Sequence, residues 1–160
     1  MTARAPRLDP SGRPLKNVGR EAVLAIAIVL SWIVTVAFVL WLTRPDAGVA
    51  VGPTPFLAGI ALVAWGGAEY TGLRHGMVWP SSACGIVGPL SVGFAICFAT
   101  PELREAPFAV KMSVISLSSA VLMMIFLFRF RLPGLVSPVI TFTLVALFLT
   151  LYGTDAARLR

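Results

Sequence analysis

Charged residues are scarce in this chain: only 12% of its 160 residues are Asp, Glu, Lys or Arg, whereas 58% are hydrophobic. A water-soluble domain carries roughly twice that charged fraction. The apolar residues gather in runs of about 20 residues, the length that crosses a hydrocarbon core of about 30 Å. The alternating segments of about 10 residues that mark membrane β-barrels are not visible. The composition therefore predicts an all-α, polytopic integral membrane protein.

Histidine and cysteine are also scarce, and this excludes several kinds of site. His75 is the single histidine, so neither a histidine-rich metal centre nor a bis-histidine haem is expected. Cys84 and Cys97 lie about 20 Å apart on a continuous helix, too far for a disulfide, and no C-x-x-C motif occurs. A phosphate-binding G-x-x-x-x-G-K-[ST] loop is missing too. The sequence therefore predicts no catalytic, metal or cofactor-binding residues, and we expect the chain not to be an enzyme.

Positive charge exceeds negative charge, with 13 Lys and Arg against 7 Asp and Glu. Cations concentrated beside an apolar span are typical of cytoplasmic segments near anionic lipids. Aromatic residues are not interleaved with them, so nucleic acid is not an expected partner. We expect an integral protein of the bacterial inner (cytoplasmic) membrane with a cytoplasmic N-terminus. The cations that crowd the N-terminal segment are Arg4, Arg7, Arg13, Lys16 and Arg20.

Prolines, glycines and charges separate five apolar runs, which predicts a five-helix transmembrane bundle with its termini on opposite sides. Residues 1–20 are expected to form a flexible basic cytoplasmic tail, residues 21–153 the transmembrane helical domain, and residues 154–160 a short polar tail. The five spans are expected at about 21–43, 56–73, 78–99, 108–128 and 134–152.

The third predicted span leaves the architecture open. It contains Pro80 and Pro89 together with Gly85, Gly88 and Gly93. A proline removes a backbone hydrogen bond and crowds the preceding turn of a helix. One possibility is five continuous spans. The alternative is four spans plus a broken or re-entrant third segment, whose freed backbone groups bind an ion or a solute.

The stretch AWGGAEYTGLRHGMVWP, residues 64–80, joins the second and third spans and contains Glu69, Tyr70, Arg74 and His75. Glu69 lies about 6 Å before the end of its span. An ionisable group at that depth is either a carboxylate that couples proton or cation movement, or half of an interfacial ion pair with Arg74. The ion pair is the favoured interpretation. Together the four residues form the candidate ion pair or coupling site.

Small residues recur four apart along the third span, and serines line the fourth. This spacing lets helix backbones approach closely, and serine hydroxyls can bond between helices. A serine nucleophile is not indicated, because no basic partner lies at a suitable spacing within the fourth span. The candidate helix-packing residues are Ser81, Cys84, Gly85, Gly88, Gly93, Ser113 and Ser116.

Two classes of function remain. The preferred one is a small non-catalytic integral-membrane subunit or accessory protein, packed into a larger membrane complex. Ionisable groups are nearly absent from the span centres, where coupled transporters usually keep one. The alternative is a small homo-oligomeric transporter or channel that uses Glu69 and a broken third span. The expected partners are the lipid bilayer and other membrane proteins or further copies of this chain.

Overall fold

The computed structural model describes residues 18–43 and 52–158. Within these two ranges every regular element is helical, which confirms the predicted all-α class. The elements are α1 (Val18–Leu42), α2 (Thr54–Ala68), η2 (Glu69–Arg74), α3 (Val78–Ala99), α4 (Pro101–Glu105), α5 (Phe108–Phe130), η3 (Pro133–Leu135) and α6 (Val136–Arg158).

Four helical stretches of the described residues are long and apolar enough to cross a membrane: Gly19–Leu42, Thr54–Leu73, Val78–Ala99 and Phe108–Phe130. In α6 the apolar stretch is shorter, Val136–Leu151, although the helix itself continues to Arg158. The helix therefore extends into the segment expected to be a polar tail. A fifth span stays a prediction. Most of the expected N-terminal tail, residues 1–17, lies outside the described residues.

Proline and left-handed residues set the helix ends. Pro55 occupies the first turn of α2, where the missing N–H has no intrahelical partner to lose. At the end of η2, Gly76 adopts a φ of 58°, a conformation that glycine reaches without strain. Arg131 ends α5 with a φ of 51°, and Pro133 then starts η3. The turns at Gly76 and Arg131 reverse the direction of the chain and lead into α3 and α6.

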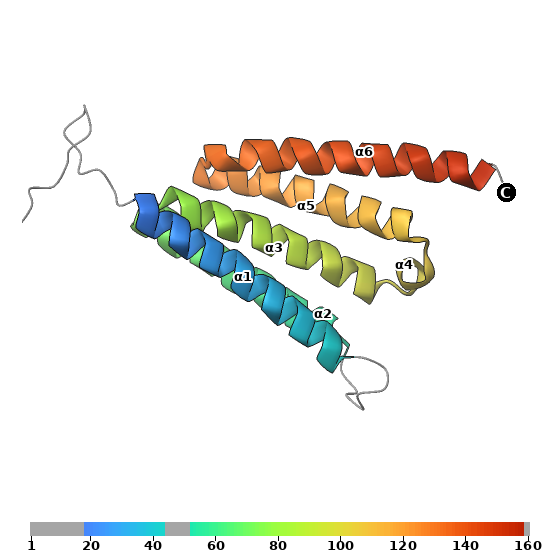
Figure 1. The fold of residues 1–160 in the computed structure, drawn as a ribbon, viewed down its shortest axis with the longest axis horizontal. Helices are drawn as coiled ribbons and strands as arrows, with labels where there is room; N and C mark the ends of the chain where they lie inside the picture. Colours follow the sequence, from blue (N-terminus) through green and yellow to red (C-terminus); the bar gives the residue numbers. More distant parts are fainter. Residues whose placement is uncertain (1–17, 44–51, 159–160) are drawn as a thin grey trace, which may run out of the picture.

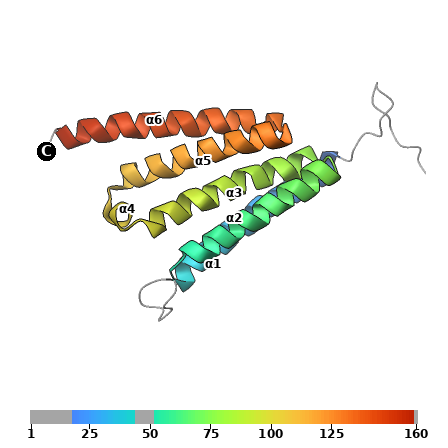
Figure 2. The ribbon, with the colours of Figure 1, turned by 180° about the vertical axis from the view of Figure 1, so that it is seen from behind.

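Helix α3 lies at the centre of the fold, with α1 and α2 on one side and α5 on the other (Figures 1 and 2). Helix α6 lies outermost and packs mainly on α5. The central place of α3 follows from its composition, because small side chains let neighbours approach it from several directions. Its buried residues include Ser81, Ser82, Ala83, Cys84, Gly85, Gly88, Ser91, Gly93 and Ala95.

The structure shows α3 as one continuous α-helix through Pro89, so the broken or re-entrant third segment considered from the sequence is not observed. Proline inside a transmembrane helix is tolerated where neighbouring groups compensate for the lost backbone bond. The residue four before Pro89 is Gly85, which has no side chain to crowd that turn. On α5, the Ser119 hydroxyl donates to the Pro89 carbonyl at 3.3 Å.

The two ends of the bundle differ. At the end where η2, η3 and the start of α1 meet, called here the η2 end, buried Phe126, Phe130 and Leu135 pack with Ala68 and Cys84. Toward the opposite end, called the α4 end, a second cluster joins α1, α2 and α3 through Val36, Leu57 and Ala95. The polar residues singled out from residues 64–80 lie at the η2 end.

Candidate functional site at the η2 end

A π-helical turn, η2, continues α2 and changes which side chains share a face. In a π-helix the backbone hydrogen bonds join residues five apart, compared with four apart in an α-helix. Tyr70 and His75 are five apart, and their rings meet edge to face with centroids 4.6 Å apart. Two of the four candidate residues are therefore in direct contact. The side chain of Arg74 lies outside the described part of the structure, so its predicted pairing with Glu69 stays a prediction.

Ser81 of α3 secures the junction between α2 and η2. Its hydroxyl donates to the carbonyl of Ala68, the last residue of α2, at 3.2 Å. A buried carbonyl at such a change of helix type needs a donor. A Cβ on Gly72 would lie 2.6 Å from the Ser81 oxygen, a clash that real structures do not show. Glycine at position 72 is therefore what allows η2 to approach α3 so closely.

Glu69 pairs with a cation from a distant helix. The Arg129 Nη2 atom, in the last turn of α5, lies 3.6 Å from Glu69 Oε1. The indole N–H of Trp65 donates to the same oxygen at 3.3 Å. The side chains of Glu69 and Arg129 are 42% and 58% exposed, so solvent reaches both partners. An ion pair this exposed contributes little to stability.

Aromatic packing holds Trp65 in position to make that hydrogen bond. The indole meets the rings of Phe126 and Phe130 edge to face, at centroid distances of 4.7 and 5.9 Å. Edge-to-face contacts are a favoured geometry for aromatic pairs. Because both phenylalanines belong to α5, this cluster ties α2 to α5 directly beside the ion pair.

The chemistry available here is that of an exposed ion pair with aromatic neighbours. Among residues 18–43 and 52–158, no three His, Cys, Asp or Glu side chains gather to form a metal site. Cys84 and Cys97 are both free and buried. A role for Glu69 in coupling proton or cation movement remains a hypothesis. The geometry supports it only by placing a solvent-accessible carboxylate at the end of a long apolar helix.

The first four candidate packing residues lie where α3 meets its neighbours at the η2 end. Besides Ser81, Cys84 is so close to α2 that a Cβ on Gly67 would lie 3.1 Å from its sulfur. A Cβ on Gly85 would lie 2.9 Å from a methyl carbon of Leu135, and one on Gly88 would lie 3.3 Å from the Ala64 side chain. These approaches leave no free space for a larger side chain.

The other three candidates concern α5. A Cβ on Gly93 would lie 3.0 Å from the carbonyl oxygen of Ile115 and from the Ser119 hydroxyl. Ser113 donates to the Ala146 carbonyl of α6 at 3.0 Å, and its oxygen lies 2.7 Å from that of Thr150. Ser116 is buried within the bundle. Hydroxyls therefore link α5 to α6 as well as to α3.

Sequence analysis missed two partnerships. The predicted topology places Arg129 on the same side of the membrane as Glu69, so this pair was compatible with the sequence. Arg74 was favoured because it lies closer to Glu69 in the sequence. The Trp32 indole of α1 donates to Ser91 of α3 at 2.8 Å, and Ser91 donates in turn to its own helix. Trp32 and Ser91 belong to different helices, so no spacing within the sequence predicts their hydrogen bond.

Comparison of the chain with models of protein families, with curated proteins and with solved structures gives no match.

A double-mutant cycle on Glu69→Gln and Arg129→Gln is expected to give an interaction energy below about 1 kcal/mol, because both partners are solvent-exposed. The measurement is unfolding of the purified chain in mild detergent, followed by tryptophan fluorescence. A coupling of several kcal/mol would show that the pair is shielded from solvent and would contradict this account of the site.

Proposed function

We propose that this chain is a small, non-catalytic integral-membrane subunit or accessory protein that packs into a larger membrane complex. One observation carries the proposal: several polar groups within the bundle make hydrogen bonds between helices. The Trp32 indole donates a hydrogen bond to Ser91, and the Ser119 hydroxyl donates to the Pro89 carbonyl. The Ser113 hydroxyl donates to the Ala146 carbonyl of α6. Groups engaged in this way hold helices together and are not available to a substrate.

The position of charge supports the same proposal. Across the described residues the recorded ion pair, Glu69 with Arg129, lies at the η2 end and is exposed to solvent. Transport proteins that couple ions usually keep an ionisable group deep in the membrane. The alternative of a homo-oligomeric transporter or channel has less support, because α3 is continuous. That alternative now rests on Glu69 alone.

The proposed location is the bacterial inner membrane, with the N-terminus in the cytoplasm. Four helices have the length and hydropathy for spanning. The η2 end carries four arginines, Arg20, Arg74, Arg129 and Arg131, whereas three cationic residues, Arg104, Lys111 and Arg158, lie toward the α4 end. An excess of arginine and lysine marks the cytoplasmic side of membrane proteins. This distribution favours a cytoplasmic η2 end, where α1 begins.

Purification of the tagged full-length chain from its own membranes in a gentle detergent tests the assembly role. We expect a second protein at fixed stoichiometry, which migrates with the chain on a native gel and persists through size-exclusion chromatography. A tagged membrane protein of similar size serves as the control for non-specific capture. Migration of the chain alone, or only with copies of itself, would overturn the subunit proposal and favour the channel alternative.

A further inference from the structure

A long groove separates α1 from α2 on the surface of α3. Its volume is about 760 Å³, and its floor is formed by Cys84 and Val87. The groove exists because α1 packs on α3 rather than on α2, and because glycine and alanine on α2, among them Gly59 and Ala64, leave space beside α1.

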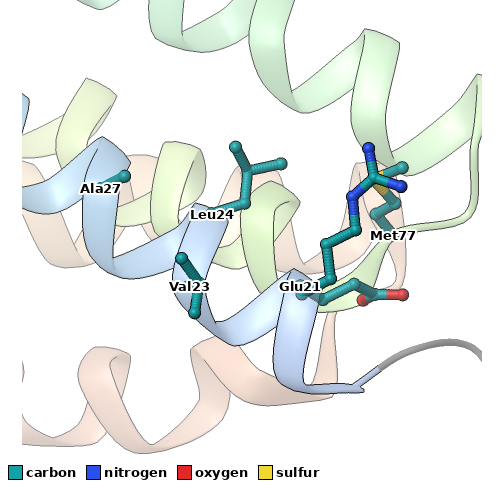
Figure 3. A pocket seen from close by; sticks show the side chains of 6 residues that line it. Glu21, Val23, Leu24, Ala27 and Met77 are labelled. Carbon is teal, nitrogen blue, oxygen red and sulfur yellow. The ribbon is translucent and has the colours of Figure 1, made fainter.

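A recess of about 420 Å³ adjoins the groove at the η2 end. Leu24 and Ala27 line both spaces, so the recess and the groove are neighbours along α1. Figure 3 shows Glu21, Leu24 and Ala27 on α1 with Met77 facing them from the turn before α3. Arg20 also lines the recess. This charged recess, called the mouth here, therefore lies beside the η2 end of the groove, which runs on along α1.

The walls of the groove suit hydrocarbon. The hydroxyls of Thr35 and Thr71 donate to carbonyls of their own helices at 2.7 Å, and the Trp32 indole donates to Ser91. Ser31 supplies the remaining hydroxyl of an otherwise apolar lining. From Arg20 to Thr35 the space extends about 22 Å along α1. One leaflet of the hydrocarbon core is about 15 Å deep. A single lipid with its headgroup at the mouth can therefore extend its chain along most of this length.

The mouth carries one charge of each sign. Arg20 and Glu21 line the same recess, and neither forms a recorded ion pair with another described residue. A zwitterionic headgroup with a phosphate and an ammonium complements this arrangement, because phosphate pairs with guanidinium and ammonium with carboxylate.

We propose that the α1–α2 groove binds one phosphatidylethanolamine molecule, with its phosphate at Arg20, its ammonium at Glu21 and an acyl chain along the groove. The bound lipid fills the space between two helices that both lie on α3. The proposal rests on the bilayer placement given above, but not on the assembly role. Failure to find a partner protein would leave it standing, and failure to bind lipid would leave the assembly role standing.

Native mass spectrometry of the full chain in mild detergent, titrated with palmitoyl-oleoyl-phosphatidylethanolamine, tests the site. We expect one lipid to bind more tightly than all later ones. Gly59→Leu fills the far end of the groove and should weaken this first step at least about threefold. No atom lies within 4 Å of a Cβ built on Gly59, so the variant should fold.

Gly66→Leu is the matched control, because it makes the same change on the same helix, also in open space, but outside the groove lining. It should bind the first lipid as the unchanged chain does. Arg20→Gln should weaken that step about threefold to tenfold. The unchanged chain should bind phosphatidylethanolamine more tightly than phosphatidylglycerol, and Glu21→Gln should remove this preference.

Three results would overturn the proposal. The first is the absence of a tight first binding step in the unchanged chain. The second is equal binding by the Gly59→Leu and Gly66→Leu variants. The third is tighter binding of phosphatidylglycerol than of phosphatidylethanolamine by the unchanged chain, which would show that the mouth selects net negative charge.

Discussion

Replacement of Gly93 by leucine is expected to lower the free energy of unfolding by about 3 kcal/mol or more. A Cβ at this position would lie 3.0 Å from the backbone oxygen of Ile115 and within 3.1 Å of the hydroxyls of Ser118 and Ser119. A backbone atom cannot rotate away as the end of a flexible side chain can. Helices α3 and α5 must therefore separate, and the bond from Ser119 to the Pro89 carbonyl should be lost.

Unfolding of the purified protein by a denaturing detergent, followed by tryptophan fluorescence, measures this effect. Gly66→Leu is the control, since a Cβ at Gly66 meets no atom within 4 Å. Its stability should stay close to that of the unchanged chain. Equal losses in both variants would show that the change of helix propensity, rather than the α3–α5 contact, governs the result.

Replacement of Phe126 by alanine is expected to cost about 2 kcal/mol or more. Its ring is only 3% exposed, lies against Trp65 and Phe130, and fills the space beside Gly85 and Gly88. Its removal leaves a cavity at the point where α2, α3 and α5 meet. In a bilayer this loss is mainly one of packing contacts, because lipid is as apolar as the side chain.

Phe128→Ala provides the comparison for this second experiment. Phe128 lies on the same helix but is 75% exposed, so the substitution removes an exposed ring and leaves no cavity. We expect a change of less than about 0.5 kcal/mol. Unfolding in detergent should show a larger loss of stability for Phe126→Ala than for Phe128→Ala. Similar losses of stability would contradict the aromatic cluster as the contact that joins α2 to α5.

The helical class of this protein follows from its sequence because length and hydropathy are properties of single segments. Each of the four long apolar helices can be recognised without knowing its neighbours. The spacing of small residues is likewise a property of one helix, and neighbouring atoms do approach Gly85, Gly88 and Gly93 closely. The identity of the neighbour at each glycine does not follow from it.

Features that depend on two or more segments were not predictable in this way. The pair of Glu69 with Arg129 joins η2 to α5 and was not expected from the sequence, while the expected pairing with Arg74 stays a prediction. The π-turn η2 depends on Ser81 of α3 and on the missing side chain of Gly72. Pro89 predicted a possible break in the third span, but the neighbouring helices accommodate the proline without one.

The central place of α3 has a consequence for the order in which the protein assembles. Helices α1 and α2 leave the ribosome first, yet each lies mainly against α3, which is made after both. The link from Trp32 to Ser91 forms only once α3 is present. The contacts that place α1 and α2 in the bundle can therefore form only after α3 has been made. Helix α6, which packs mainly on α5, is the last to join the bundle.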